Sequence, residues 1–281
     1  MNESQRRAWA ALDIGPAWVL RAPPSEAAAH GAALVSEPQP QSRPTQAPAP
    51  EGPPAPLPPA LSEPPMSAAP GRDDLAGLDL DGLRERVATC RDCGLCESRN
   101  RTVFGVGDRR PHWMVIGEAP GAEEDRRGEP FVGQAGRLLD AMLAAVGLGR
   151  EQGVFIANVL KCRPPGNRNP RPEEVARCAP FLRRQVELLR PRLILVVGRF
   201  AAQTLLGTDA SIASLRGRVH RYRAGELDVP VVVSYHPAYL LRDRHEDKAR
   251  CWQDLCLARA TAGPREQDAG PDRPSGSSPN Q

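Results

Sequence analysis

The second half of the chain alternates short apolar strands with longer helical segments, and this alternation is the strongest constraint on the fold. The predicted strands are almost wholly apolar and cover residues 112–117, 154–159, 193–198 and 229–235. The predicted helices cover residues 134–146, 172–189, 200–206 and 244–258. Strands without a polar face are typical of a parallel sheet that is covered on both sides. We therefore predict a three-layer α/β/α fold around a central, mainly parallel, four-stranded sheet.

Distinctive residues stand at the end of each predicted strand. They are Gly117-Glu118-Ala119-Pro120-Gly121, Asn158, Gly198-Arg199 and His236-Pro237. The carboxyl ends of parallel strands meet at one edge of a sheet, and ligands bind there in open α/β sheets. A glycine-rich loop between a strand and a helix also lets backbone amides approach a ligand. The sequence therefore predicts one site at this edge.

The region before the alternation does not favour a folded core. Proline accounts for 31 of 281 residues, aromatic residues for only 4%, and no aromatic residue lies between Trp18 and Phe104. Such proline-rich sequence favours an extended, solvated linker. We predict a short apolar and charged segment over 1–21, a disordered linker over 22–78, a folded domain over 79–261 and a disordered tail over 262–281. The first segment is either a docking peptide for a protein partner or a strip that folds back on the domain.

Charge and hydropathy exclude some classes of protein. The formal net charge of +3 is too small to indicate a nucleic-acid partner by itself, because local patches create the attracting field. The N-terminal apolar run is interrupted by Asp13 and Gly15-Pro16, which argues against a secretion signal. No window approaches the roughly 20 apolar residues of a membrane span. We expect a soluble, cytoplasmic, monomeric protein.

Seven cysteines without a secretion signal indicate a reducing compartment, where clustered cysteines more often bind metal than form disulfides. Cys90-x-x-Cys93, together with Cys162 and Cys178, supplies four soft ligands. Such thiolates suit zinc or an iron-sulfur cluster, and ligand type alone does not choose between them. A zinc knuckle normally uses two close pairs, whereas fifteen residues separate the second pair here. Cys96 adds a third cysteine to the first group.

Three separated stretches resemble the successive motifs of one enzyme family. They are residues 117–133, residues 158–168 and residues 236–241. Together with the cysteine pattern, they are similar to the thermophile-type, iron-sulfur uracil-DNA glycosylases of family 4, and the likeness spans roughly residues 87–258. The resemblance implies a uracil-DNA glycosylase-like fold. It also implies a DNA-repair hydrolase that flips uracil out of DNA and hydrolyses its N-glycosidic bond, leaving an abasic site for base excision repair.

The resemblance also implies roles in binding uracil. Phe131 would stack on the flipped base and Asn158 would read its polar edge, because a carboxamide can pair with N3–H and O4 of uracil. Glu124 and the loop around Glu118, including Gly117 and Ala119, would close the site and help to exclude the methyl group of thymine.

For catalysis, the resemblance implies that the His236 imidazole stabilises negative charge on uracil O2 while the glycosidic bond breaks. Water then attacks the cationic sugar, and Glu118, Glu124 and Asn167 are the candidates to orient it. The loop that enters the duplex would consist of Tyr239, Leu240, Leu241 and Arg242, with leucine filling the vacated space and arginine meeting phosphate.

For the cysteines, the resemblance implies a structural [4Fe-4S] cluster on Cys90, Cys93, Cys162 and Cys178, with Cys96 as a bystander. A related family that forms a covalent adduct with abasic DNA carries glutamine in the first motif and a basic insertion, whereas this chain has Ala119 and no insertion. An alternative of another class is a non-catalytic iron-sulfur protein that binds nucleic acid in association with a polymerase.

Overall fold

The computed structural model describes residues 73–242 and 245–264. The predictions for the N-terminal segment, for most of the linker and for most of the tail lie outside the described residues. Within the described ranges, no helix is long and apolar enough to cross a membrane.

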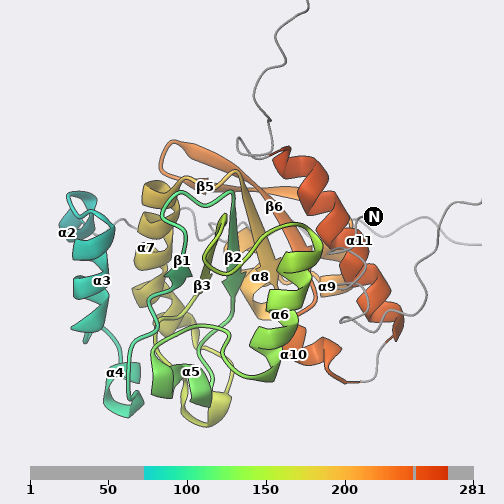
Figure 1. Cartoon of the computed structure of the whole chain (residues 1–281). Coiled ribbons are helices and arrows are strands. Elements are labelled where there is room, and N and C mark those ends of the chain that lie inside the picture. The colour runs from blue at the N-terminus through green and yellow to red at the C-terminus, as the bar shows by residue number, and fades with distance from the viewer. Residues whose placement is uncertain (1–72, 243–244, 265–281) are drawn as a thin grey trace, which may run out of the picture. The chain divides into compact units, whose positions relative to one another are not determined.

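A six-stranded sheet forms the centre of the fold, in the order β1-β3-β2-β4-β6-β5 (Figure 1). The four predicted strands are its parallel core: β2 (Trp113–Gly117), β3 (Val154–Asn158), β4 (Leu193–Val197) and β6 (Leu227–Ser234). Two antiparallel edge strands flank them, β1 (Val106–Gly107) and β5 (Val219–Ala224). The sequence analysis missed both edge strands, because β1 has only two residues and β5 is mostly polar and half-exposed.

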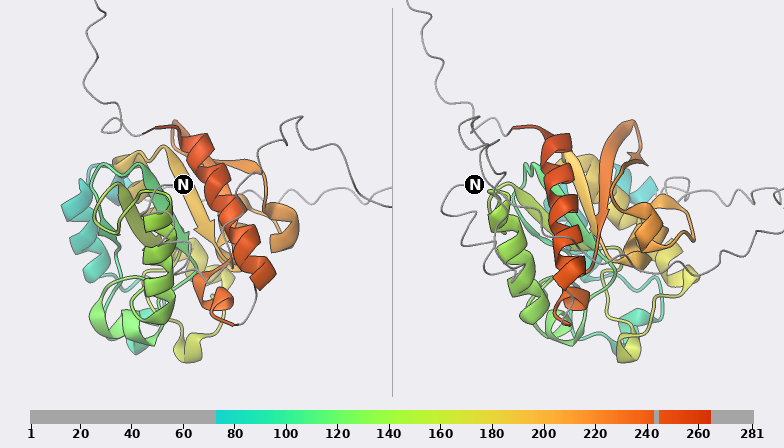
Figure 2. Two further views of the ribbon diagram at one scale, coloured as in Figure 1. Left: turned by 45° about the vertical axis from the view of Figure 1, so that its right-hand side comes forward. Right: turned by 90° about the vertical axis from the view of Figure 1, so that its right-hand side faces the viewer.

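Helices cover both faces of the sheet, as Figures 1 and 2 show, so the predicted three-layer α/β/α class is confirmed. On one face, Met114 and Ile116 of β2 join a core with α3 (Leu80–Ala88), α7 (Pro172–Leu189) and α8 (Arg199–Leu206). On the other face, Trp113 and Val115 pack in a core with α6 (Gln134–Ala145) and α11 (His245–Ala262). Successive side chains of β2 thus enter opposite cores, which is why the strand has no polar face.

Short helices occupy the connections between these elements. They are α2 (Asp73–Ala76), α4 (Leu95–Ser98), α5 (Ala122–Arg127), the 3-10 helix η2 (Pro165–Asn167), α9 (Ile212–Leu215) and α10 (Pro237–Leu240). Because α5 follows β2 and α10 follows β6, both lie at the carboxyl edge of the sheet, below it in Figure 1. The helix α2 precedes the predicted domain boundary at residue 79, and its Leu75 is buried in the first core.

Candidate active site and cysteine centre

Gly117, at the end of β2, brings two predicted base-binding residues together. Gly117 pairs with Asn158 in the parallel register of β2 and β3. A Cβ atom on Gly117 would lie 2.4 Å from Asn158 Oδ1 and 2.6 Å from the Phe131 ring. Only glycine leaves room for this approach. The Asn158 side chain is buried, and its amide makes no hydrogen bond to another described residue, so its donors and its acceptor remain available to a ligand.

Phe131 has an unusual backbone conformation, with φ at +53°. Its carbonyl oxygen accepts a hydrogen bond from Arg150 Nη2 at 2.7 Å, while Nη1 of the same side chain donates to Pro130 O at 2.9 Å. Asp140 Oδ1 accepts from Arg150 Nε at 3.0 Å. Gly136 also packs against the Phe131 backbone, because a Cβ atom on Gly136 would lie 1.6 Å from Phe131 O. A left-handed non-glycine residue persists only where its surroundings enforce it, and these contacts do so.

His236, two residues after β6, completes this group of side chains. Its ring stacks on the Phe131 ring, with centroids 5.4 Å apart and planes inclined by 27°. Nδ1 accepts the Ala238 N–H at 3.1 Å, which assigns the proton of the neutral imidazole to Nε2. Burial lowers the pKa of His236 to about 4. At neutral pH the side chain is therefore an uncharged donor through Nε2–H. We call Gly117, Phe131, Asn158 and His236 the sheet-edge site.

The three candidates for orienting water differ in their surroundings. Glu118 is half-buried, and burial raises its pKa while the Arg199 guanidinium opposes the shift. Glu124 Oε2 accepts the Gly121 N–H at 3.0 Å, so this carboxylate caps its own helix, α5. Asn167 is exposed, and its Oδ1 accepts from Arg163 Nε at 2.8 Å. Of the three, only Glu118 adjoins a member of the sheet-edge site in sequence.

The predicted DNA-binding residues differ in how far their side chains are exposed. Tyr239 is half-buried. Tyr239 stacks on Tyr235 with ring centroids 5.3 Å apart, and its hydroxyl donates to Asp247 Oδ2 at 2.9 Å. Leu241 is 47% exposed and Arg242 is also exposed.

Leu240, one of the predicted DNA-binding residues, is buried in this structure. Its side chain is 1% exposed and packs in the core shared with α6 and α11. The cause is helical spacing in α10, which places Pro237 and Leu240, three residues apart, on its buried face. Leu241, one position further, points away from that core.

The four predicted metal ligands line one cavity. Cys90 and Cys93 follow α3, Cys162 lies beyond β3, and Cys178 belongs to α7. We call this the cysteine cavity. Cys96 is absent from its lining. Among the described residues, no group of three or more His, Cys, Asp or Glu side chains converges closely enough for a single metal ion. Four soft sulfur donors that line one cavity without converging on a single point suit a multinuclear cluster better than one tetrahedral ion.

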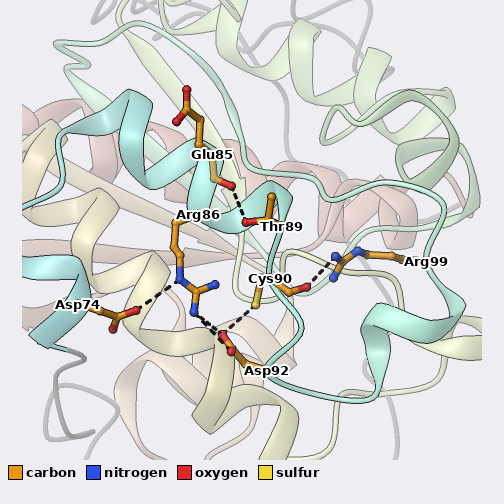
Figure 3. Close-up of polar contacts among 7 residues, drawn as sticks. All are labelled: Asp74, Glu85, Arg86, Thr89, Cys90, Asp92 and Arg99. Atoms are coloured by element: carbon orange, nitrogen blue, oxygen red, sulfur yellow. Dashed lines mark hydrogen bonds and ion pairs between the residues drawn. The ribbon is translucent and has the colours of Figure 1, made fainter.

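Cationic and polar groups surround the cysteine cavity. Arg99 Nη1 donates to Cys162 Sγ at 3.1 Å and Nη2 donates to Cys90 O at 2.7 Å. As Figure 3 shows, Asp92 accepts from Cys90 Sγ at 2.9 Å and from Arg86, whose Nε also reaches Asp74 at 3.4 Å. This chain of contacts ties the cavity to α2.

Burial keeps the cysteines of the cavity protonated in the metal-free protein. It raises the pKa of Cys90 to about 11 and that of Cys178 to about 12. It also raises the pKa of Cys93 and of Cys162. Metal binding would have to displace these protons, and Arg99, which contacts Cys162 Sγ, would help to stabilise the resulting thiolates.

Two residues that the sequence analysis did not assign to a site lie against these groups. Arg150 holds the Phe131 backbone, and no sequence signal marked it. Lys161 is 1% exposed, lines the cysteine cavity, and donates from Nζ to Asn158 O at 2.8 Å. The sequence does mark Lys161, because it is one of two lysines in an arginine-rich chain and follows the apolar pair Val159-Leu160.

Comparison with known proteins identifies the family. The family model described as the uracil DNA glycosylase superfamily matches residues 104–256, which is more than half of the chain. A type-4 uracil-DNA glycosylase of Archaeoglobus fulgidus is 42% identical over 186 residues, covering 63% of this chain and 93% of the relative. A type-4 uracil-DNA glycosylase of Thermotoga maritima is 42% identical over 167 residues, covering 59% of this chain and 85% of the relative. The chain belongs to the type-4 uracil-DNA glycosylase family of that superfamily.

Proposed function

We propose that this protein is a hydrolase that removes uracil from DNA by cleaving its N-glycosidic bond, leaving an abasic site and initiating base excision repair. The observation that carries this proposal is the sheet-edge site, in which Phe131, Asn158 and His236 converge around Gly117 in the fold of this family. The alternative, a non-catalytic nucleic-acid-binding protein, needs no such convergence of a ring, an amide and an imidazole donor.

Recognition of uracil rests on Phe131 and Asn158. The base, flipped out of the duplex, stacks against the Phe131 ring, whose backbone Arg150 and Gly136 hold in place. The free amide of Asn158 accepts from N3–H and donates to O4, whereas cytosine presents the opposite pattern. The turn of Glu118 and Ala119, together with Glu124 at the start of α5, closes the site against the thymine methyl group.

Catalysis rests on the uncharged His236. As the glycosidic bond lengthens, negative charge gathers on uracil O2, and the donor Nε2–H stabilises it. The Nδ1 contact to Ala238 N–H holds the tautomer in which Nε2 carries the proton. A neutral imidazole can act as such an electrophile where burial has lowered its pKa. Glu118 is the candidate of the three that the geometry favours for orienting water, because it directly follows Gly117 and is half-buried.

The cysteine cavity would hold a [4Fe-4S] cluster on Cys90, Cys93, Cys162 and Cys178. Its four soft donors and the arginines at its wall support this assignment. When bound, such a cluster would serve as a structural cross-link: Cys90 and Cys93 would hold it from the segment after α3, Cys162 from the segment after β3, and Cys178 from α7.

We also assign DNA contact to Leu241 and Arg242, with Tyr239 supporting their loop through Tyr235 and Asp247. Leu241 then fills the space that uracil vacates, in place of Leu240. The proposal further includes a monomer in the cytoplasm and a protein partner for residues 1–21, which lie outside the described residues.

The test is base release from a uracil-containing oligonucleotide by the purified full-length protein, with alkaline cleavage of the abasic product. Strand cleavage at uracil, and none at thymine in a matched oligonucleotide, is the expected result. His236→Ala should lower the rate of base release by roughly 100- to 1000-fold, the usual cost of losing one such donor, while DNA binding is retained. Binding of uracil-containing DNA without cleavage by the parent protein would favour the non-catalytic alternative.

A further inference from the structure

The side chain of Lys161 lies between the cysteine cavity and the sheet-edge site. It is 1% exposed, and its Nζ donates to Asn158 O at 2.8 Å and to Gln185 Oε1 at 2.6 Å. Gln185 is itself fully buried, and its Nε2 donates to Phe104 O at 2.8 Å. The ammonium group thus fastens the backbone of the residue that reads the base to the interior of the protein.

The same residue is tied to the cysteines through its backbone. Lys161 N–H donates to Cys178 Sγ at 3.3 Å, and the next residue is Cys162. Its carbonyl oxygen accepts from Val103 N at 2.8 Å. Lys161 is also one of the residues that line the cysteine cavity. Lys161 therefore makes direct contacts with both regions.

The charge of Lys161 has no carboxylate partner within the described residues. A buried ammonium needs a compensating anion, because removing it from water is costly. The backbone N–H of Lys161 contacts Cys178 Sγ, and Lys161, Cys162 and Cys178 line the same cavity. Thiolates of Cys162 and Cys178 that held a metal would therefore be the anions available to balance this ammonium group.

We propose that Lys161 is a positioning residue that couples the cysteine centre to uracil recognition: its ammonium group balances the ligated thiolates and holds Asn158 through the Asn158 carbonyl. This inference rests on the proposed function, since it assigns the reading of uracil to Asn158. It gives the centre an influence on base binding without any part in bond cleavage.

Two substitutions separate the charge of Lys161 from its anchoring contact. Lys161→Met keeps an unbranched side chain that is one atom shorter, and it removes both the charge and the contact. Gln185→Glu keeps an acceptor for Nζ and places a carboxylate beside it, so it neutralises the charge while the contact to Asn158 remains. It loses the hydrogen bond to Phe104, so the thermal midpoint of each variant is measured as well. Lys248→Met, at the only other lysine, is the matched control.

Each iron-loaded full-length protein is assayed for the rate of iron loss to a chelator, followed by visible absorbance, and for affinity for free uracil by calorimetry. Lys161→Met should lose iron about tenfold faster and bind uracil about tenfold more weakly, the effect of roughly one charge-assisted hydrogen bond. In kinetics, KM should rise more than kcat falls. Gln185→Glu should lose iron faster but keep its uracil affinity, and Lys248→Met should change neither.

The inference is overturned if Lys161→Met loses iron at the rate of the parent protein, or if it binds uracil as tightly as the parent protein does. If Lys161→Met does not fold, Gln185→Glu decides: faster iron loss with retained uracil affinity supports the inference, and an unchanged rate overturns it. A parent protein that neither binds nor releases uracil overturns the proposed function instead. The iron-loss rates of Lys161→Met and Lys248→Met then still decide whether Lys161 balances the thiolates.

Discussion

The sheet-edge site and the cysteine cavity share the short segment from Asn158 to Cys162, yet the protein builds them differently. The sheet-edge site follows from the backbone: paired strand ends, a left-handed Phe131 and a glycine with no room for a Cβ. The cysteine cavity is assembled by side chains from segments far apart in the sequence, with Arg99 bridging Cys90 and Cys162.

This difference teaches that the two regions should tolerate different changes. Adding a single methyl group should damage the sheet-edge site, because its geometry is set by close packing. The cysteine cavity should instead be sensitive to the chemistry of its donors and indifferent to small additions nearby. Four predictions test this contrast.

The largest expected effect concerns the ligand set. Cys178→Ser should abolish iron binding and lower the free energy of unfolding by about 4 kcal/mol or more, the range reached when a metal site is lost. Cys96→Ser should leave iron content and stability unchanged, because Cys96 does not line the cavity. Iron analysis and denaturant unfolding of the two variants measure this. Loss of iron in Cys96→Ser alone would reverse the assignment of the ligands.

The next effect concerns packing at the sheet edge. Gly117→Ala should lower kcat/KM for uracil release by about 100-fold, or ~2.7 kcal/mol, because the new Cβ collides with Asn158 and Phe131. Gly94→Ala is the matched control beside Cys93, since no atom lies within 4 Å of a Cβ there. Steady-state kinetics with iron analysis distinguishes the two. Equal kinetics for both variants would show that close packing at Gly117 does not matter.

A smaller effect is expected from the start of the chain. A protein that begins at Asp79 loses the buried Leu75 and the contact of Asp74 with Arg86, whereas one that begins at Asp73 keeps them. The shorter protein should be less stable by about 2 kcal/mol, mainly because the burial of the Leu75 side chain against the first core is lost. Both proteins should release uracil at the parental rate. Thermal unfolding and a base-release assay test this, and equal stability would show that α2 contributes nothing.

The smallest effect concerns pH: the rate of base release should not depend on the titration of His236 over most of the pH range. The pKa of His236 is about 4 in the folded protein, below its ordinary value of 6.5. The rate of base release should therefore stay constant from about pH 8 to about pH 5 as far as His236 determines it, and should fall near its folded pKa. In the window between the two pKa values the unfolded state binds more protons, so stability decreases as pH falls. Single-turnover rates on protein shown to be folded provide the test; a midpoint near 6.5 would contradict it.

Much of the fold could be predicted because its strands are buried on both faces. The apolar runs that became β2, β3, β4 and β6 have no polar alternation, and that pattern belongs to a covered parallel sheet. The edge strand β5 could not be found in this way, since it alternates exposed and buried residues and contains two arginines and a histidine. The helix α5 was also missed, because its sequence is almost entirely charged and has no apolar period.

Much of the candidate site could also be predicted, because the ends of parallel strands fall at one edge wherever such a sheet forms. Gly117, Asn158 and His236 were expected there and lie there. The sequence could not tell which of two adjacent leucines is exposed, because a helical turn buries Leu240 and leaves Leu241 at the surface. Arg150 could not be predicted, since its partners are backbone carbonyls about 20 residues away and carry no sequence mark.

The sequence by itself determined the class of the fold, the edge that carries the site and the set of cysteines, because apolar periodicity and ligand chemistry are local properties of the chain. Tertiary structure decided which groups act together. Only packing shows that His236 is uncharged with its donor at Nε2, that Glu124 caps a helix, and that Lys161 joins the two regions. Burial and hydrogen-bond partners depend on atoms that lie far apart in the sequence, so no local pattern contains them.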